Sequence, residues 1–449
     1  EYLLSAKELA FDRTVISDVR AEGKGHKARK GPLLIPLHLR ARRLDGQGEL
    51  IEGIIRNFVL DGVLQLKGQQ VLSNPMTIRS DKLSGKLLML ADLKTGRYDF
   101  GLDGQIRGLA IRGLGIVDLT SKLHAVPGAK GTFSLSGTAI ARMRRLDNSF
   151  LRSLGGGLPV VRSGLSLGAD GQLNFTSLHL EAPLLSLNAT GYRRRDRTFH
   201  FEGAGTHKRY GPLRLTLDGK IERPTIDLLL QRPLDALGVT DMRVHLIPDQ
   251  AGYGFTAQGG STLGAFTGNG AILLPRGGQA VVRVAQLAAS GVTASGDLRP
   301  VTGGLEGQLN VAGPLNGSIV FAPVNAIQQL VLKLDATDAS FNGPTVIAVR
   351  RGKLDATLLL DPAGTSIKAT VQARGLRVGG VLVGRLAPNA DLIGGRGAGN
   401  ASPSGQRGRL FDLQGEADVE PDRIWVAARG TIDKRPIRLT RRAAFTRSA

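Results

Sequence analysis

The sequence contains no cysteine, and aromatic residues make up only 4% of its 449 residues. The lack of cysteine excludes disulfides, thiol catalysis and thiolate metal sites. No segment approaches the roughly 20 consecutive apolar residues that a membrane-spanning helix requires. The single Trp and five Tyr offer few rings on which nucleic-acid bases could stack, so we expect no nucleic-acid partner. Glycine, in contrast, is abundant, with 61 residues.

Short runs in which apolar and polar residues alternate fill the chain, and most of them stop at a glycine. Clear examples are residues 98–104, 213–219 and 411–419. Successive side chains of a strand point to opposite faces, so each run predicts a strand with one apolar and one polar face. The glycines supply the positive φ angles that hairpin turns need. The sequence therefore predicts an all-β fold, a long curled antiparallel β-sheet with an open apolar groove.

One segment breaks the alternation. Over residues 144–154 the apolar residues recur at helical spacing, and three glycines follow. We expect a short inserted helix there, with a glycine-rich stop that ends at residue 157. The strand pattern on either side then gives two β-groove segments, residues 1–143 and residues 158–449.

Two smaller features lie within the second of these segments. Residues 396–408 are a low-complexity stretch of glycine, serine and arginine, which predicts a mobile loop. A short helical turn is expected over residues 234–237, after Pro233. The chain opens at Glu1 within a strand-like pattern and without a signal peptide, so we expect a piece of a longer protein whose membrane anchor lies outside it.

Catalytic motifs are nearly absent. Gly164, Ser166 and Gly168 match the G-x-S-x-G pattern of a hydrolase nucleophile, but that motif requires a turn from strand to helix. Here the alternation resumes as a strand instead. His200 and His207 have no pair of carboxylates at ligand spacing, so we expect them to be surface histidines of strands. The sequence predicts no enzyme, no metal site and no cofactor.

The formal net charge is +21, and basic residues gather at the expected turns, most strongly over residues 193–197. Such an excess favours anionic partners such as nucleic acid, phospholipid headgroups or lipopolysaccharide. Charge at hairpin tips is also a common device against aggregation. The charge alone therefore leaves the partner open.

The apolar face needs a cover, because large exposed apolar surfaces mark binding sites. Two packed sheets would bury it in an inert core, whereas one curled sheet would leave a trough that acyl chains could fill. The residues expected to line this trough are Tyr98, Phe100, Leu102, Phe133, Leu135, Leu173, Phe175, Leu185, Leu187, Phe199, Phe201, Leu213, Leu215, Leu217, Ile226, Leu228, Leu230, Phe411 and Leu413. The basic residues expected on its rim, near anionic headgroups, are Arg193, Arg194, Arg195, Lys208 and Arg209.

Three stretches, residues 213–238, 252–264 and 421–430, resemble the repeat pattern of the TamB proteins of Gram-negative bacteria, which belong to the AsmA-like group of bridge-like proteins. The resemblance covers essentially the whole chain and is clearest from Leu165 onward. It rests on the order of short phrases and not on an invariant motif. This chain resembles a mid-chain segment of such a protein, without the amino-terminal anchor or the characteristic carboxy-terminal domain.

The resemblance implies a β-taco sheet in the periplasm, anchored to the inner membrane by a segment outside this chain. It further implies phospholipid transport to the outer membrane, support of outer-membrane biogenesis, and an Omp85-type barrel partner (TamA) that contacts parts outside this chain. We expect a monomer that binds phospholipids through their acyl chains and anionic headgroups. The alternative is a β-solenoid or adhesin-like scaffold without lipid transport, although no fixed repeat length is visible.

Overall fold

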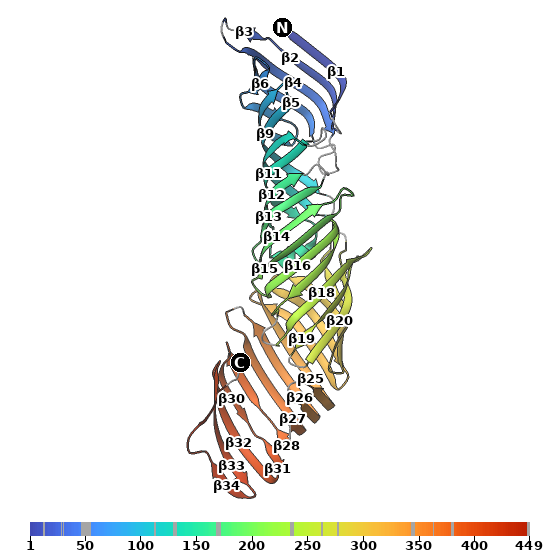
Figure 1. Cartoon of the computed structure of the whole chain (residues 1–449). Helices are drawn as coiled ribbons and strands as arrows, with labels where there is room; N and C mark the ends of the chain where they lie inside the picture. Colours follow the sequence, from blue (N-terminus) through green and yellow to red (C-terminus); the bar gives the residue numbers. More distant parts are fainter. Residues whose placement is uncertain are drawn as a thin grey trace. The chain divides into compact units, whose positions relative to one another are not determined.

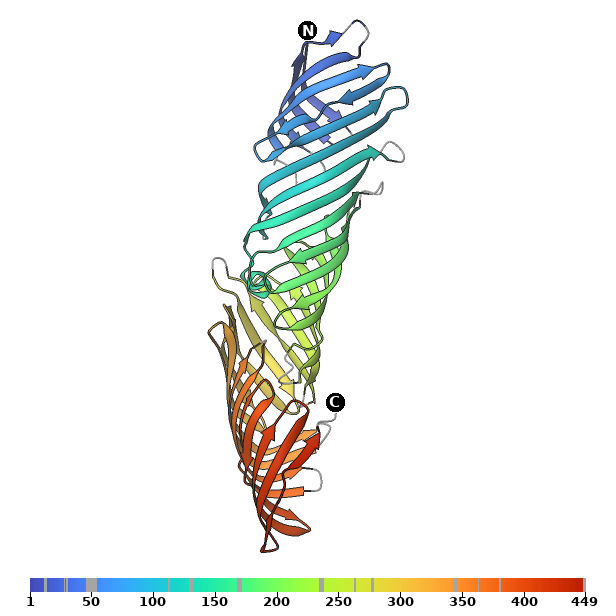
Figure 2. The same ribbon diagram turned by 90° about the vertical axis from the view of Figure 1, so that its left-hand side faces the viewer.

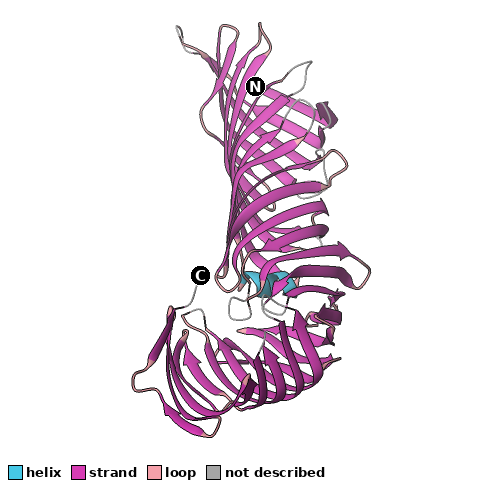
Figure 3. Cartoon of the chain, turned by 60° about the horizontal axis from the view of Figure 1, so that its bottom comes forward, coloured by secondary structure: helices cyan, strands magenta, loops and turns pink. Residues whose placement is uncertain are grey.

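In the computed structural model of this protein the fold is almost entirely β, which confirms the predicted fold class (Figure 3). The strands belong to one antiparallel sheet, and a single short helix interrupts them in the part of the chain that the structure describes. The described residues are 1–11, 14–27, 29, 31–45, 55–111, 114–128, 133–167, 172–233, 238–261, 264–275, 278–342, 346–361, 363–378 and 381–446.

The chain divides into two compact units, each made of residues whose Cα atoms lie close to one another. The first unit comprises Glu1–Thr206 and Arg214–Thr225, and the second comprises His207–Leu213 and Ile226–Ala449. The boundaries expected from the sequence at residues 143 and 157 both lie inside the first unit.

The first unit contains most of the strands that Figure 1 colours from blue to green. In chain order these are β1 (Tyr2–Phe11), β2 (Thr14–Gly23), β3 (His26–Lys27), β4 (Leu33–Asp45), β5 (Ile55–Lys67), β6 (Gln70–Ser73), β7 (Met76–Arg79), β8 (Leu83–Asp92), β9 (Arg97–Ile111), β10 (Gly115–Pro127), β11 (Phe133–Leu146), β12 (Val160–Leu167), β13 (Leu173–Glu181), β14 (Leu185–Arg193), β15 (Phe199–His207) and β16 (Gly211–Lys220).

The second unit contains the later strands. They are β17 (Arg223–Leu230), β18 (Thr240–Pro248), β19 (Gly252–Ser261), β20 (Gly264–Leu273), β21 (Val281–Ala289), β22 (Val292–Val301), β23 (Gly304–Ala312), β24 (Leu315–Val324), β25 (Ile327–Asn342), β26 (Val346–Leu360), β27 (Ser366–Val378), β28 (Val381–Leu386), β29 (Asn389–Ile393), β30 (Arg396–Ala401), β31 (Ser404–Arg407), β32 (Arg409–Val419), β33 (Arg423–Ile432), β34 (Arg435–Arg438) and β35 (Ala443–Thr446). The second unit also contains His207 at the end of β15 and residues 211–213 of β16, whereas residues 223–225 of β17 belong to the first unit.

Within each unit the strands pair with their sequence neighbours. In the first unit the pairing runs from β1 through β2, β4 and β5, divides over β6 and β7, rejoins at β8 and continues to β14. Figure 2 shows these strands following one another and curving around a common face. In the second unit the pairing runs from β17 to β27, divides over the short strands β28–β31, and rejoins at β32.

The core lies on one face of the sheet, because apolar residues at alternate positions meet opposite apolar residues on the next strand. In the first unit Phe58, Leu60, Met76, Ile78 and Leu83 form a buried cluster on this face. In the second unit a comparable cluster includes the residues Ala294, Leu298, Leu309, Val311 and Leu334. The opposite face carries charged residues such as Lys86, and also exposed apolar residues such as Leu88 and Leu90.

The helix expected over residues 144–154 is present but shorter. It is α1 (Ser149–Gly155), and it begins there because the Asn148 side chain accepts a hydrogen bond from the Leu151 amide at 3.1 Å. Gly156, with φ 69°, ends it in the left-handed conformation. The expectation that residues 144–146 are helical was wrong: they continue β11, where Leu146 is buried at 6% exposure opposite Gly115.

The loop expected over residues 396–408 is largely two short strands, β30 and β31. β30 pairs with β29 and β32, and β31 pairs with β28 and β32. Neighbouring strands therefore supply backbone partners that a glycine-rich composition does not reveal. Residues 234–237, where a helical turn is expected, lie outside the described residues.

Candidate functional site

The apolar face of the first unit consists of rows of side chains that pass from strand to strand. In one row Met89 lies opposite Phe100, Phe100 opposite Ala125, and Ala125 opposite Leu135. In the next row Leu87 lies opposite Leu102, which in turn lies opposite Leu123. Directly opposite residues of an antiparallel pair share a face, so these rows place the side chains on the same side of the sheet.

These rows surround a hollow of about 350 Å³, which we call the first-unit hollow. Every lining residue is apolar, and strands β4, β5 and β7–β11 all contribute. The lining residues are Leu37, Leu60, Met76, Leu87, Met89, Phe100, Leu102, Leu123, Ala125 and Leu135. Met76 at 1% exposure and Leu60 at 8% form the buried floor. A space of this kind cannot satisfy the hydrogen bonds of a polar ligand, so it suits an aliphatic one.

At the floor of the first-unit hollow, Gly62 lies directly against the large side chain of Met76. A Cβ atom added to Gly62 would lie 2.3 Å from Met76 Cγ, so Met76 packs directly over the backbone of β5. Such a distance is far below a normal van der Waals contact. The pairing of a glycine with a bulky neighbour therefore fixes where Met76 can lie.

Three of the residues expected to line the trough, Phe100, Leu102 and Leu135, line the first-unit hollow. Tyr98 lies beside them, with its ring stacked on Phe100 at 4.9 Å. The side chain of Phe133, the first residue of β11, lies outside the described residues. The other lining residues of the hollow, among them Leu87 and Met89, were missed.

The remaining expected lining residues of the first unit occupy the same face further along the ladder. Phe175 packs against Phe199 and Phe201, with ring centroids 6.2 Å and 5.3 Å apart. Leu173 lies opposite Leu167 on β12. The others there are Leu185 and Leu187 on β14, and Leu215 and Leu217 on β16.

In the second unit, strand β17 places its expected residues opposite apolar partners on β18. Ile226 lies opposite Leu246, and Leu228 lies opposite Val244. The rest are Leu213, Leu230, Phe411 and Leu413. The structure thus distributes the expected residues over both units and brings only part of them to the first-unit hollow.

The expected basic rim is not uniform. Arg193, the last residue of β14, lies opposite Leu173 and so faces the apolar side, half-buried, with its guanidinium 5.9 Å from the centre of the Phe199 ring. Arg194 follows on the polar side. Arg195 is exposed in the turn, and in the second unit Lys208 is exposed while Arg209 is half-buried. The interpretation of all five as one solvated rim was wrong for Arg193, because strand alternation continues to the end of β14.

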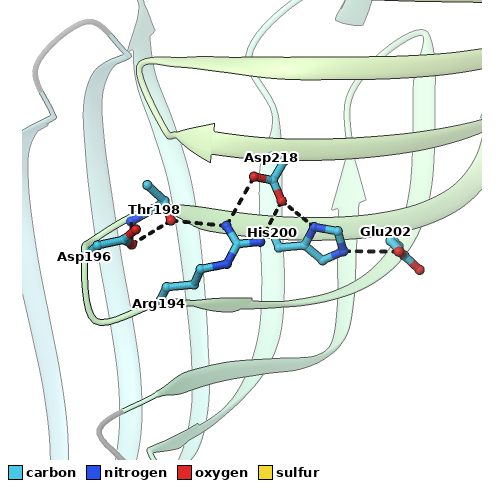
Figure 4. Close-up of polar contacts among 6 residues, drawn as sticks. All are labelled: Arg194, Asp196, Thr198, His200, Glu202 and Asp218. Atoms are coloured by element: carbon cyan, nitrogen blue, oxygen red, sulfur yellow. Dashed lines mark hydrogen bonds and ion pairs between the residues drawn. The ribbon is translucent and has the colours of Figure 1, made fainter.

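The polar face of the first unit carries a compact charged cluster, drawn in Figure 4. Arg194 donates through Nη1 to Asp218 Oδ1 at 3.2 Å and through Nη2 to Asp218 Oδ2 at 2.7 Å. His200 Nδ1 lies 2.7 Å from Asp218 Oδ2, and His200 Nε2 lies 3.1 Å from Glu202 Oε1. The Arg194 guanidinium, and then the His200 ring, hold the pKa of the Asp218 carboxyl below its usual value.

A histidine beside a carboxylate also occurs in catalytic triads, but this cluster holds no nucleophile aligned with the ring. The Thr198 hydroxyl accepts from Arg194 Nη1 at 3.1 Å and donates to Asp196 Oδ1 at 2.7 Å. Hydrogen bonds from Thr198 lower the pKa of the Asp196 carboxyl. The cluster therefore braces neighbouring strands through ion pairs and hydrogen bonds.

The other residues that the sequence offered as candidates for catalysis or metal binding lie in positions that serve the fold. Gly164 and Ser166 lie within strand β12 and not at a turn into a helix. His207 was expected at the surface, but it is buried at 2% exposure: the Tyr210 ring stacks on it at 4.5 Å, and its Nδ1 accepts from the amides of Arg209 and Tyr210 at 3.1 Å and 3.2 Å. Nowhere in the described ranges do three or more His, Asp or Glu side chains gather as they would around a metal ion.

A second hollow of about 560 Å³ lies in the second unit, on the polar face. Its walls include Lys333 opposite Asp355, and Lys368 opposite Asp391. Lys368 and Asp391 are more than half exposed and lie 3.5 Å apart. Solvent-exposed ion pairs of this kind are common on the polar face of a sheet and do not by themselves indicate a binding site. We therefore take the smaller, apolar hollow of the first unit as the candidate site.

Within the described part of the chain, the structure contains no helix with the length and apolar character of a membrane span. No protein-family model matches this chain, and no curated protein matches it significantly. The class of the protein is therefore defined by its fold and its surface: a curled, all-β antiparallel sheet with one apolar and one polar face.

Proposed function

We propose that the apolar face of this sheet carries the acyl chains of phospholipids, and that the protein is a non-enzymatic conduit for lipids between the two membranes of a Gram-negative cell. The observation that supports this most strongly is the first-unit hollow, because only apolar side chains line it. Each methylene moved from water to such a site gains about 0.8 kcal/mol.

The form of the site suits passage better than storage. Transport along a surface needs weak and similar sites in succession, since one tight pocket would hold its ligand. From β8 to β11 the rows of leucine, methionine and phenylalanine repeat from strand to strand, and the paired residues that line the hollow there include no polar side chain that would fix a ligand at one register. The headgroups would remain in water near the basic turns.

The cellular setting follows from the resemblance described above. A periplasmic location, an inner-membrane anchor outside this chain, a role in outer-membrane biogenesis and contact with an Omp85-type barrel all belong to this proposal. The competing proposal is a scaffold that presents turns to partners, and it requires the apolar face to bind no lipid.

A pair of leucines that are neighbours on β8 gives a matched test. Leu87 lines the first-unit hollow, whereas Leu88 lies on the opposite face and is 49% exposed. We expect Leu87→Asp to reduce the phospholipid that co-purifies, as measured by native mass spectrometry, and Leu88→Asp to leave it unchanged. Circular dichroism should show the same β-sheet content for both variants. Equal lipid in the two variants, or none in the unmodified chain, would contradict the proposal and favour the scaffold.

A further inference from the structure

Arg193 is a cation on the apolar face. It lies opposite Leu173 in the β13–β14 pair, and on the preceding pair Leu173 lies opposite Leu167. Its guanidinium lies over the Phe199 ring at 5.9 Å. A charge on an otherwise apolar lining costs desolvation energy, so its presence there calls for a role that a leucine could not fill.

A continuous row of the ladder leads from the first-unit hollow to this arginine. Leu135, which lines the hollow, lies opposite Leu167, which lies opposite Leu173, which lies opposite Arg193. With neighbouring strands about 4.8 Å apart, these three steps span about 14 Å. The hydrocarbon of a bilayer is about 30 Å thick, so the acyl chains of one leaflet reach about 15 Å. An acyl chain whose headgroup lies at Arg193 therefore extends along this row and reaches Leu135, at the edge of the hollow.

The neighbouring arginine serves the other face. Arg194 is engaged by Asp218 through two hydrogen bonds on the polar side, so the β14–β15 hairpin presents one guanidinium to each face. Guanidinium groups bind phosphate oxygens through paired, charge-assisted hydrogen bonds. Beside the aromatic rings of Phe175, Phe199 and Phe201, such an interaction is less weakened by water than it would be at an exposed turn.

We propose that Arg193 binds the phosphate of a phospholipid whose acyl chain extends along this row to the first-unit hollow. This inference rests on the proposed function and adds selectivity to it: lipids that carry a phosphate bind in preference to lipids with the same acyl chains and no phosphate. Arg193 is then the point at which a diffusing lipid pauses, because headgroup and chain contacts are made together.

The test measures competition between phosphatidylglycerol and diacylglycerol with identical acyl chains, presented to the whole chain in detergent and detected by native mass spectrometry. We expect the unmodified chain to favour phosphatidylglycerol about tenfold, the gain of one charged hydrogen bond. Arg193→Met should abolish the preference and still bind diacylglycerol, because methionine suits an apolar face. Arg193→Lys should retain most of the preference. Arg194→Gln, which changes a residue on the polar face, should retain the full preference.

The outcomes separate the two proposals. A preference that survives in Arg193→Met would overturn the role of Arg193 while leaving lipid binding intact. No binding of either lipid by the unmodified chain would overturn the proposed function itself. Excess inorganic phosphate should leave bound phosphatidylglycerol in place, since it lacks the acyl contacts. Its displacement by phosphate would show a free-anion site and overturn the lipid assignment of Arg193.

Discussion

Arg194 and Asp218 form a two-point hydrogen bond on the polar face of the first unit, with N–O distances of 3.2 Å and 2.7 Å. The same carboxylate contacts His200. One acidic side chain therefore joins a basic hairpin turn to strand β16. The arrangement makes the pH dependence of stability a direct test of the cluster.

Replacing Asp218 with Asn removes the carboxylate whose pKa is lowered in the folded protein, chiefly by Arg194. A carboxyl with a lowered folded pKa stabilises the fold above its unfolded pKa of about 3.9, and the contribution is lost as the pH falls through the folded value. We expect Asp218→Asn to lower the urea midpoint of unfolding at pH 7. At pH 3 the urea midpoint of the variant should approach that of the unmodified chain. The effect should be small, because the Asp218 side chain is 47% exposed. A difference that grows towards pH 3 would contradict this sign.

Met76 is the most buried side chain at the floor of the first-unit hollow, at 1% exposure. Met76→Ala should destabilise the fold by about 2–5 kcal/mol, because the substitution removes buried contacts and enlarges a cavity. Chemical denaturation measures the change. Leu88→Ala, which shortens a half-exposed side chain on the opposite face of the adjacent strand, is the control and should cost far less. Equal costs would show that the two faces are not distinguished in this way.

Gln328 is a polar side chain buried at 6% exposure in the second unit. Its Oε1 accepts from the Leu305 amide at 2.6 Å, and its Nε2 donates to the Leu305 carbonyl at 3.1 Å. The side chain thus pairs with a strand backbone as a neighbouring strand would. Gln328→Leu should cost about 1–3 kcal/mol, because it leaves these backbone groups without their partner. Gln372→Leu, at an exposed position of β27, should have little effect, and the two are compared by thermal unfolding.

Access to the first-unit hollow can be followed with a fluorescent apolar probe. Leu123 lines the hollow from β10, whereas Val126 of the same strand is 40% exposed. We expect Leu123→Arg to reduce probe binding severalfold and Val126→Arg to leave it unchanged, since a buried cation opposes an apolar ligand. Displacement of the probe from the unmodified chain by phosphatidylglycerol would tie the hollow to lipid. Equal loss in both variants would place the probe elsewhere.

The alternation of the sequence predicts the strands and the residues on the apolar face where it is regular, as in Tyr98, Phe100 and Leu102. It fails over Leu87–Leu90, because all four residues are apolar and only the pairing with β9 shows which two face inward. It also fails at bulges: the register shifts between Phe175 and Leu178, so spacing alone misassigns the face there.

The polar cluster could not be predicted, because contacts between distant residues depend on which strands pair. Asp218 lies 18 positions after His200, and no local pattern connects them. Arg193 shows the opposite case. It follows the alternation of β14 to the end of the strand, but the presence of two further arginines led to its interpretation as part of a solvated turn.

Pairing between sequence neighbours has a consequence for how such a unit can change in length. A strand in the first unit contacts mainly the strands before and after it, so removing one hairpin leaves the flanking strands antiparallel and able to rejoin. Adding or losing a single strand would reverse the direction of all that follow. Growth by duplication is therefore expected to proceed two strands at a time. Each added pair would extend the apolar face of the sheet without requiring any other part of the unit to adapt.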